Sequence, residues 1–384
     1  MLNLHVGHSQ LPDTSSAVEE CIQQIKDSVG RESVLGTLLF ASSDHDTAAV
    51  LDGVRSAFPE VPLVGCTTSG ELTSAQGFCE GSLVLTAFSG EGVEIGAGIG
   101  KGTAADPREA GAAAAKMAQE AVSLPSRFCL TFPDGLTSNC DEVVQGIQSV
   151  LGETFPIFGG AAADDWKFEK TYQCFGNGLF SDSVPVLLFA GEIDFSFGCA
   201  HGWTPFTKRV EVTHSEGNVV YTIDGRPALD LYRHYVGTDA SPSAEYPLAV
   251  FSDEVGEDFY LRAGMQYDAE VGSITFAGDV PQSSWVQISK TSRDTIVSAC
   301  KESLQSAVDT ATETSPQAAL VFSCAARKEQ LGTRTKLETQ ALNEHLATSI
   351  PMAGFYCYAE IAPLRPNTPT QVHNETFITL LLNG

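Results

Sequence analysis

The sequence uses one pattern of apolar strands, prolines and glycines three times. In each copy an apolar segment typical of a strand precedes a proline, two apolar residues and a glycine, and the copies lie at residues 34–65, 128–159 and 319–354. The first two copies are offset by 94 residues at both the strand and the glycine. Such self-similarity means that one supersecondary unit is built repeatedly, and no other feature limits the fold as much.

The elements around each copy recur in the same order. A helical stretch precedes the main strand, at 16–29, 106–122 and 293–310, and it follows a short apolar strand, which in the third copy is 285–288. A second helix, such as 46–58, lies before the proline, and an apolar strand closes the unit. We therefore predict an α/β fold of three strand–helix–strand–helix–strand–strand repeats, with crossover connections and mixed, largely parallel sheets.

A segment of different character separates the second and third repeats. Residues 193–283 are rich in β-branched and aromatic residues and contain several turn signals. A helix is predicted at 227–236, because a proline stands in its first turn and a glycine just past its end. The sequence thus predicts a first domain, 1–192, with two repeats. A second domain, 193–384, holds this β-rich insert and the third repeat at 284–384.

The charge of the chain argues against two classes of partner. There are 48 acidic and 22 basic residues, for a net charge of −26, and no run of lysines and arginines. Such a field repels nucleic acid and anionic membranes. We also expect a cytoplasmic protein, because no signal peptide is evident and no apolar stretch approaches the roughly 20 residues of a membrane span. The ten cysteines lack the spacing of a zinc site, so no metal is expected.

Polar loops follow the main strands of every repeat, whereas the strands themselves are apolar. In open α/β sheets, ligands collect at the carboxyl ends of parallel strands. We therefore expect a ligand-binding pocket built from these loops. Its candidate residues are Ser69, Glu71, Asp134, Asp164, Asp165, Trp166, Cys324, Arg327, Tyr356 and Glu360.

Three acidic candidates share one position of the repeat. Glu71, Asp165 and Glu360 each lie six residues after the glycine of their unit. One interpretation is that they point into a shared pocket and hold a ligand amine or hydroxyl through charge-assisted hydrogen bonds. The other is that each carboxylate caps a helix or a neighbouring loop amide. Repeats preserve structural devices as readily as functional ones, so the sequence leaves both open.

Cys324 is the foremost candidate nucleophile. Arg327, three residues later, would lower the pKa of its thiol, although a small buried residue at a strand end is the alternative. A hydrolase-like enzyme would use a central polar pocket, where three units close around a pseudo-threefold axis. The sequence has no GxSxG elbow, no GxGxxG and no GxxxxGK[ST] loop, and no motif ties a histidine to a nucleophile. We therefore expect no enzymatic activity.

Five segments of the chain resemble those of FIST proteins. They are Cys66–Glu71, Phe158–Asp165, His201–Trp203, Ser323–Arg327 and Glu360–Pro363, and they occur in the family's order. The similarity runs through essentially the whole chain. It implies that residues 1–192 form a FIST N-terminal domain and residues 193–384 its C-terminal partner.

The resemblance implies a sensory module of bacterial signal transduction that binds small ligands such as amino acids. No kinase, cyclase or methyl-acceptor segment is attached, so the module is expected to stand alone and act through a separate partner. Some family members resemble haem-binding nitric-oxide sensors that regulate a histidine kinase, which makes sensing of a diatomic gas an alternative. His201 and His373 would then be candidate axial ligands of a noncovalent haem b, since no CxxCH is present; each is otherwise a structural histidine.

Overall fold

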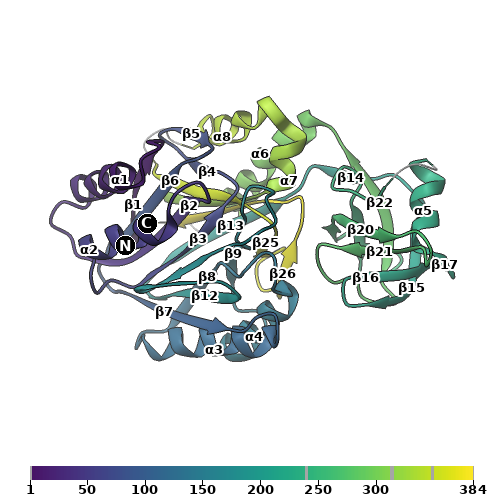
Figure 1. Ribbon diagram of the computed structural model, residues 1–384, viewed down its shortest axis with the longest axis horizontal. Coiled ribbons are helices and arrows are strands. Elements are labelled where there is room, and N and C mark those ends of the chain that lie inside the picture. The colour runs from purple at the N-terminus through teal and green to yellow at the C-terminus, as the bar shows by residue number, and fades with distance from the viewer. Residues whose placement is uncertain (1, 238–240, 312–314, 347–349, 384) are drawn as a thin grey trace.

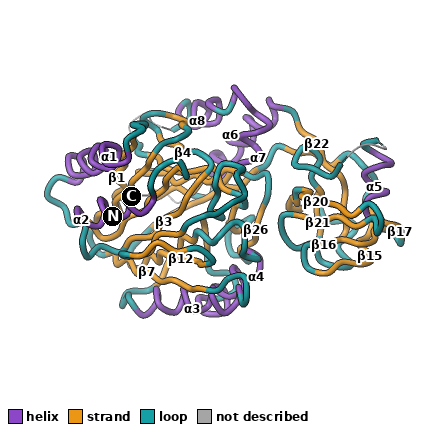
Figure 2. Tube along the Cα trace, in the orientation of Figure 1, coloured by secondary structure: helices purple, strands orange, loops and turns teal. Residues whose placement is uncertain are grey.

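The computed structural model describes residues 2–237, 241–311, 315–346 and 350–383. It consists of a large body and a smaller β-rich part at one side (Figure 1). The large body holds three six-stranded sheets, and the smaller part holds a nine-stranded sheet. Helices lie on the outside of the large body, whereas strands form its interior (Figure 2). The chain is therefore a mixed α/β protein.

The first sheet has the strand order β1-β6-β2-β3-β10-β11. β6 lies between β1 and β2 and is antiparallel to both, whereas β2 and β3 are parallel neighbours. The side chains of Asp13 and Asp46 accept backbone N–H groups at the starts of the two helices of this unit. The elements are β1 Leu2–Ser9, α1 Thr14–Val29, β2 Val34–Ser42, α2 Thr47–Ala57, β3 Leu63–Thr68, β6 Leu83–Gly90, β10 Gln173–Phe175 and β11 Gly178–Phe180.

The other two sheets have an equivalent order. The second is β7-β12-β8-β9-β25-β26 and the third is β13-β27-β23-β24-β4-β5. The elements of the second are β7 Val93–Lys101, α3 Pro107–Glu120, β8 Ser126–Thr131, α4 Cys140–Leu151, β9 Ile157–Gly160, β12 Ser183–Gly191, β25 Glu360–Pro363 and β26 Thr370–His373. Those of the third are β13 Asp194–Ala200, α6 Arg293–Asp309, β23 Pro316–Cys324, α7 Ala325–Leu331, the 3-10 turn Gly332–Arg334, α8 Lys336–Asn343, β24 Met352–Cys357, β27 Phe377–Asn383, β4 Glu71–Thr73 and β5 Gly77–Cys79.

Each unit completes the sheet of another unit with a short hairpin. β4 and β5 come from the first unit but pair at the edge of the third sheet, next to β24. β10 and β11 of the second unit join β3, and β25 and β26 of the third unit join β9. The exchange closes a ring of three sheets, so no unit can complete its sheet without a neighbour.

The strand directions and one strand assignment differ from the sequence prediction. The sheets are mixed, as predicted, but each contains a single parallel pair, so they are not largely parallel. The reason is that the closing strand of each unit inserts between two parallel strands. The segment predicted to open the third unit lies in β22 of the insert sheet, and β13 takes the expected place beside β27. The insert therefore interrupts the third unit between its first strand and its first helix.

The β-rich insert forms an antiparallel sheet with one helix among its described residues, as predicted. Its strand order is β19-β18-β22-β15-β16-β21-β20, with β14 beside β22 and β17 beside β16. Tyr232 of the helix is fully buried against the sheet. The elements are β14 Trp203–Pro205, β15 Val210–Glu216, β16 Val219–Ile223, β17 Arg226–Pro227, α5 Ala228–Tyr235, β18 Leu248–Phe251, β19 Phe259–Arg262, β20 Gly264–Asp268, β21 Ser273–Phe276 and β22 Trp285–Thr291.

The inner faces of the three sheets meet in one apolar core. Phe40, Phe132, Phe322 and Phe355 are fully buried there, with ring centroids 4.6 to 6.3 Å apart. The outer faces pack against the helices in separate apolar clusters. Strands buried on both faces explain the nearly continuous apolar runs of the sequence. Phenylalanines thus occupy the centre where a hydrolase-like protein was expected to have a polar pocket. None of the described helices combines the length and apolar character needed to cross a bilayer.

Candidate functional site

The acidic residues aligned by sequence spacing are not three equivalent positions. In each exchanged hairpin, the first residue pairs with the residue after the repeat glycine of the neighbouring unit. The three pairs are Glu71 with Phe355, Gln173 with Cys66, and Glu360 with Gly160. Gln173 is therefore the counterpart of the two glutamates. Asp165 lies eight residues before it, in a longer loop of the second unit. The prediction of a threefold-repeated acid is wrong because this loop changes the spacing.

These three side chains anchor the start of the closing strand in their own unit. The hydroxyls of Thr68 and Ser82 donate to Glu71, and the hydroxyl of Ser183 donates to Gln173 Oε1 at 3.0 Å. The backbone N–H of Thr376 donates to Glu360 Oε2 at 2.9 Å. Burial raises the pKa of Glu71 and of Glu360 to about 8. The contacts support the structural interpretation of these carboxyl groups.

Other predicted polar residues hold loops together. Asp134 accepts two backbone N–H groups of its own loop and that of Asp182. Asp164 accepts the backbone N–H groups of residues 168, 169 and 170 and the hydroxyl of Tyr358. Ser69 Oγ accepts the N–H of Asp165 at 3.0 Å. These side chains shape the loops at the strand ends, and their acceptor atoms are already used.

Arg327 and Tyr356 belong to a closed internal network. The Arg327 guanidinium contacts Glu338 Oε1 through two N–H groups, at 3.0 and 2.7 Å, and donates to the carbonyl oxygens of His201 and Ile296. Tyr356 donates its hydroxyl to Glu338 Oε2. All three side chains are fully buried. They stabilise the third unit and leave no free donor for a ligand. Arg327 and Tyr356 therefore lie in the interior of this unit and not in the predicted pocket wall.

Cys324 does not have the electrostatic surroundings of a nucleophile. Burial, followed by the nearby Glu360 and Glu375 carboxyl groups, raises the pKa of its thiol well above the usual value. Arg327, which was expected to lower the pKa, is paired with Glu338 instead. Cys324 and Cys357 are directly opposed on parallel strands β23 and β24. Both line a pocket at the ends of these strands.

A pocket lies at the carboxyl ends of strands from the second and third sheets. We call it the strand-end pocket; its volume is about 750 Å³. Its walls come from the loops after β8 and β9, the loops after β23 and β24, and the edge of the insert sheet at β20 and β21. Its lining includes Leu136, Thr137, Asn139, Asp141, Trp166, Phe168, Ala244, Met265, Phe276, Asp279, Ala326, Tyr358 and Asn374.

Three aromatic rings form one wall of the strand-end pocket. The ring centroids of Trp166, Phe168 and Tyr358 are 5.4 to 5.6 Å from one another. Trp166 has φ 62° and Phe168 has φ 51°, a left-handed backbone that bulky residues rarely adopt. The four hydrogen bonds of Asp164 hold this loop in place. Backbone strain of this kind clusters at binding sites, where it positions side chains.

The charged residues that line the strand-end pocket are all acidic. No lysine or arginine belongs to its described lining. Asp141 is paired with the buried Arg262 at 3.0 Å, and Asp279 accepts the Asn139 amide at 3.2 Å. Burial, and then the neighbouring Asp141 carboxylate, raise the pKa of Asp279. The pocket therefore suits a ligand with an apolar body and a hydrogen-bond donor.

Sequence reasoning found part of this pocket and missed the rest. Trp166 and Cys324 were predicted and do line it. Tyr358 was missed, although it lies in a loop that the repeat had already singled out. Met265 and Asp279 were also missed, because the insert has no counterpart in the other units and hence no spacing to compare.

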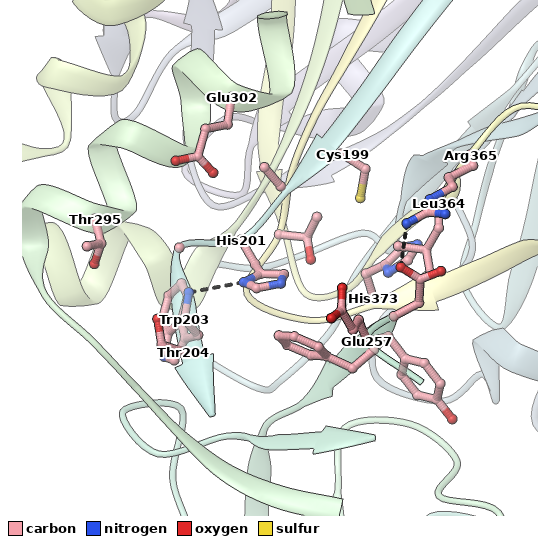
Figure 3. A pocket seen from close by; sticks show the side chains of 16 residues that line it. Cys199, His201, Trp203, Thr204, Glu257, Thr295, Glu302, Leu364, Arg365 and His373 are labelled. Carbon is pink, nitrogen blue, oxygen red and sulfur yellow. Dashed lines mark hydrogen bonds and ion pairs between the residues drawn. The ribbon is translucent and has the colours of Figure 1, made fainter. Parts of the chain in front are cut away.

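A second pocket, of about 410 Å³, contains both predicted histidines, and we call it the two-histidine pocket (Figure 3). His201 follows β13, and His373 ends β26. Burial, followed by the charge of Arg327 and the nearby His373, lowers the pKa of His201 to about 4. Burial also lowers the pKa of His373 to about 4. Both imidazoles are therefore neutral at neutral pH.

Comparison with known protein families assigns the chain to one of them. The FIST N domain matches residues 37–226, and the FIST C domain matches residues 228–363. This chain belongs to the FIST family. The protein is also similar to the uncharacterized protein MJ1623 of Methanocaldococcus jannaschii, with 26% identity over 315 residues that cover 75% of this chain. The FIST chain spans about 60% of the length of that relative.

Solved structures similar to this FIST protein are distant in sequence. A cyanuric acid hydrolase, described as an innovation by structural concatenation, has a TM-score of 0.41 and 8% identity, with full coverage of both chains. The cyanuric acid hydrolase of A. caulinodans has a TM-score of 0.41 and 9% identity, also over both full chains. T. maritima PurL complexed with ADP has a TM-score of 0.22 and 13% identity, and is 72% covered. Scores this low carry no argument about activity.

The two histidines of the FIST protein do not fit the role of axial haem ligands. The backbone N–H of Trp203 donates to His201 Nδ1 at 3.0 Å, so the proton of the neutral ring is on Nε2. His373 Nε2 donates to the carbonyl oxygen of Ala362 at 2.9 Å. Neither ring thus presents an Nε2 lone pair to iron. No group of three or more His, Cys, Asp or Glu side chains in the described ranges is arranged to hold a metal ion.

Proposed function

We propose that this FIST protein is a sensory protein that binds a small, amino-acid-like ligand in the strand-end pocket and acts through a separate signalling partner. The observation that carries the proposal is the pocket itself. Its volume of about 750 Å³ falls within the usual range of small-molecule sites, and three aromatic rings form one wall. Membership of the FIST family supports the sensory role.

The groups around the strand-end pocket suit the two ends of such a ligand. The ring cluster of Trp166, Phe168 and Tyr358 offers an apolar and aromatic surface to a side chain. Asp279 is an acceptor for an amino group, and no cation competes for that group in the described lining. The first turn of α4, at Cys140 and Asp141, borders the pocket and offers backbone N–H groups to an oxygen acceptor.

The position of the pocket provides a route from binding to signalling. One wall belongs to the three-sheet body and the facing wall to the insert sheet. A ligand that contacts both walls binds more tightly when the walls are close together than when they are apart. Binding therefore shifts the protein toward the conformation with close walls. The insert would then present an altered surface to the partner, for which a histidine kinase is one candidate.

Ligand binding can be tested with the full chain and the twenty standard amino acids, each added separately. A ligand at 100 times its Kd stabilises the folded state by about 2.7 kcal/mol, which a thermal-shift assay detects readily. Quenching or enhancement of tryptophan fluorescence should accompany the shift, and it should be lost in Trp166→Phe. The ligands expected to act are those with an apolar or aromatic side chain.

A matched pair of variants locates the effect. Ala244→Trp adds a large side chain to the pocket lining and should abolish the thermal shift, whereas Ala105→Trp, on an exposed loop of the second unit, should preserve it. Asp279→Asn should weaken binding of ligands with a free amino group. The proposal fails if no amino acid stabilises the protein, or if Ala244→Trp and Ala105→Trp respond to the ligand equally.

A further inference from the structure

The two imidazoles of the two-histidine pocket present opposite hydrogen-bonding groups. Because Trp203 N–H occupies Nδ1 of His201, its Nε2 carries the proton and is a donor. Because His373 Nε2 donates to the carbonyl of Ala362, its Nδ1 carries the lone pair and is an acceptor. Neither of these two nitrogens has a partner among the described residues.

His373 is held in this state by burial. Its side chain is only 1% exposed, yet it lines the pocket, where it faces His201 and Glu257 (Figure 3). Because the ring lines the pocket and its Nδ1 has no partner within the described protein, a ligand in the pocket that donates a hydrogen bond can reach that nitrogen.

The charged residues that line the pocket are mainly acidic. Glu257, Asp258 and Glu302 line the pocket, and Arg365 is the one cation of the described lining. Arg365 is already paired with Asp258 at 2.5 Å. Glu257 and Glu302 have no partner among the described residues. The pocket therefore has excess negative charge, which favours a cation and opposes a carboxylate or a phosphate.

Aromatic rings complete the pocket wall. Phe259 lies against His201, with ring centroids 4.8 Å apart, and Tyr260 is its neighbour in β19. The faces of such rings attract ammonium groups. The volume of about 410 Å³ is sufficient for a small organic molecule.

We propose that the two-histidine pocket is a second ligand site, which takes a small primary ammonium ion carrying a carbonyl or hydroxyl oxygen. The ammonium group donates to His373 Nδ1 and is stabilised by the carboxylate of Glu257 and by the net negative charge of the pocket lining. The oxygen accepts the proton of His201 Nε2. This site is separate from the strand-end pocket, and the two lining sets share no residue. It stands whether or not the strand-end pocket binds an amino acid.

The first test uses glycinamide as the probe, because it combines an ammonium group with a neutral carbonyl. Imidazole nitrogen NMR spectra of the full chain, labelled with ¹⁵N at histidine, should show two rings that shift on titration with glycinamide at pH 7. His201→Asn and His373→Gln assign them, because each removes one signal. Glycine, which adds a carboxylate, and acetamide, which lacks the ammonium group, should each bind at least about tenfold more weakly.

The same two substitutions test the roles of the rings by calorimetry. An asparagine can replace His201 Nδ1 as acceptor for Trp203 N–H while removing the donor in the pocket. A glutamine can replace His373 Nε2 as donor to Ala362 while removing the acceptor. Each should weaken glycinamide binding by about tenfold or more. His214→Asn, on the exposed part of β15, and Ala244→Trp, in the other pocket, should leave the affinity unchanged.

Three results would overturn the proposal; the first two use the wild-type protein, and the third requires a thermal unfolding curve showing that the variant is folded. One is a wild-type spectrum in which glycinamide shifts no histidine ring. Another is equal affinity for glycine and glycinamide, which would contradict the charge argument. A third is loss of glycinamide binding in Ala244→Trp, which would place the probe in the strand-end pocket instead.

Discussion

The substitution Glu71→Gln should make the protein more stable, and increasingly so as the pH rises. Glu71 is fully buried, and the hydroxyls of Thr68 and Ser82 contact its carboxyl group. The chain already contains a glutamine at the equivalent position of another unit. Gln173 begins the corresponding hairpin and accepts the hydroxyl of Ser183. An amide is therefore compatible with this place in the fold.

The magnitude follows from the difference in proton binding between the folded and unfolded states. Burial raises the pKa of Glu71 from its ordinary value of 4.5 to about 8. Below pH 4.5 both states are protonated, and the carboxyl group makes no pH-dependent contribution. Between pH 4.5 and about 8 only the unfolded state releases the proton, so folding weakens by about 1.4 kcal/mol per pH unit. The wild type thus loses about 3 kcal/mol from this group by pH 7, and the variant loses none.

The assay is urea unfolding of both proteins at a series of pH values from 4.5 to 8.5. The difference in the free energy of unfolding between variant and wild type should increase with pH and become constant above about pH 8. Glu19→Gln, at an exposed position of α1, is the matched control and should give a constant difference. Parallel curves for Glu71→Gln and wild type would refute the reasoning, because they would mean that the folded and unfolded states titrate alike.

Three further outcomes follow from the packing. Arg327→Met leaves the buried carboxylate of Glu338 without its cation and should cost about 3 to 5 kcal/mol in chemical denaturation, whereas a loss under 1 kcal/mol would mean that the network is dispensable. Phe132→Ala opens a cavity where the three sheets meet and should also cost about 3 to 5 kcal/mol, against no more than about 1 kcal/mol for Leu124→Ala at a 37% exposed site. Cys324 should react with iodoacetamide at pH 7 much more slowly than a free thiol does, because the pKa of its thiol is raised; labelling within minutes would contradict the buried, protonated state.

The predictions that succeeded depend on local chemistry. Apolar runs such as Leu83–Gly90 indicate strands, and in the structure Asp13 and Asp46 cap the two helices predicted in the first repeat. The repeat adds that the same segments recur in order. The helix of the insert was also predictable, since a proline begins it and a glycine follows it. Trp166 was predicted as a pocket residue because it follows a main strand, and it lines the strand-end pocket.

The partners of these segments were decided by the tertiary structure. Counting from a glycine matched Asp165 to Glu71, but strand register makes Gln173 the counterpart. Sequence proximity placed Arg327 beside Cys324, but a buried guanidinium requires an anion, and Glu338 supplies it. Distance along the chain contains no information about either pairing.

The sequence by itself determined a chain of α/β units with the segments and motifs of the FIST family. The tertiary structure alone decided that each unit gives its hairpin to another sheet, and that the insert closes one side of the strand-end pocket. The physical reason is that propensity and capping act within a few residues. Edge pairing, burial and pocket formation depend on which surfaces meet, and here those surfaces come from segments more than a hundred residues apart, as β4 and β24 do.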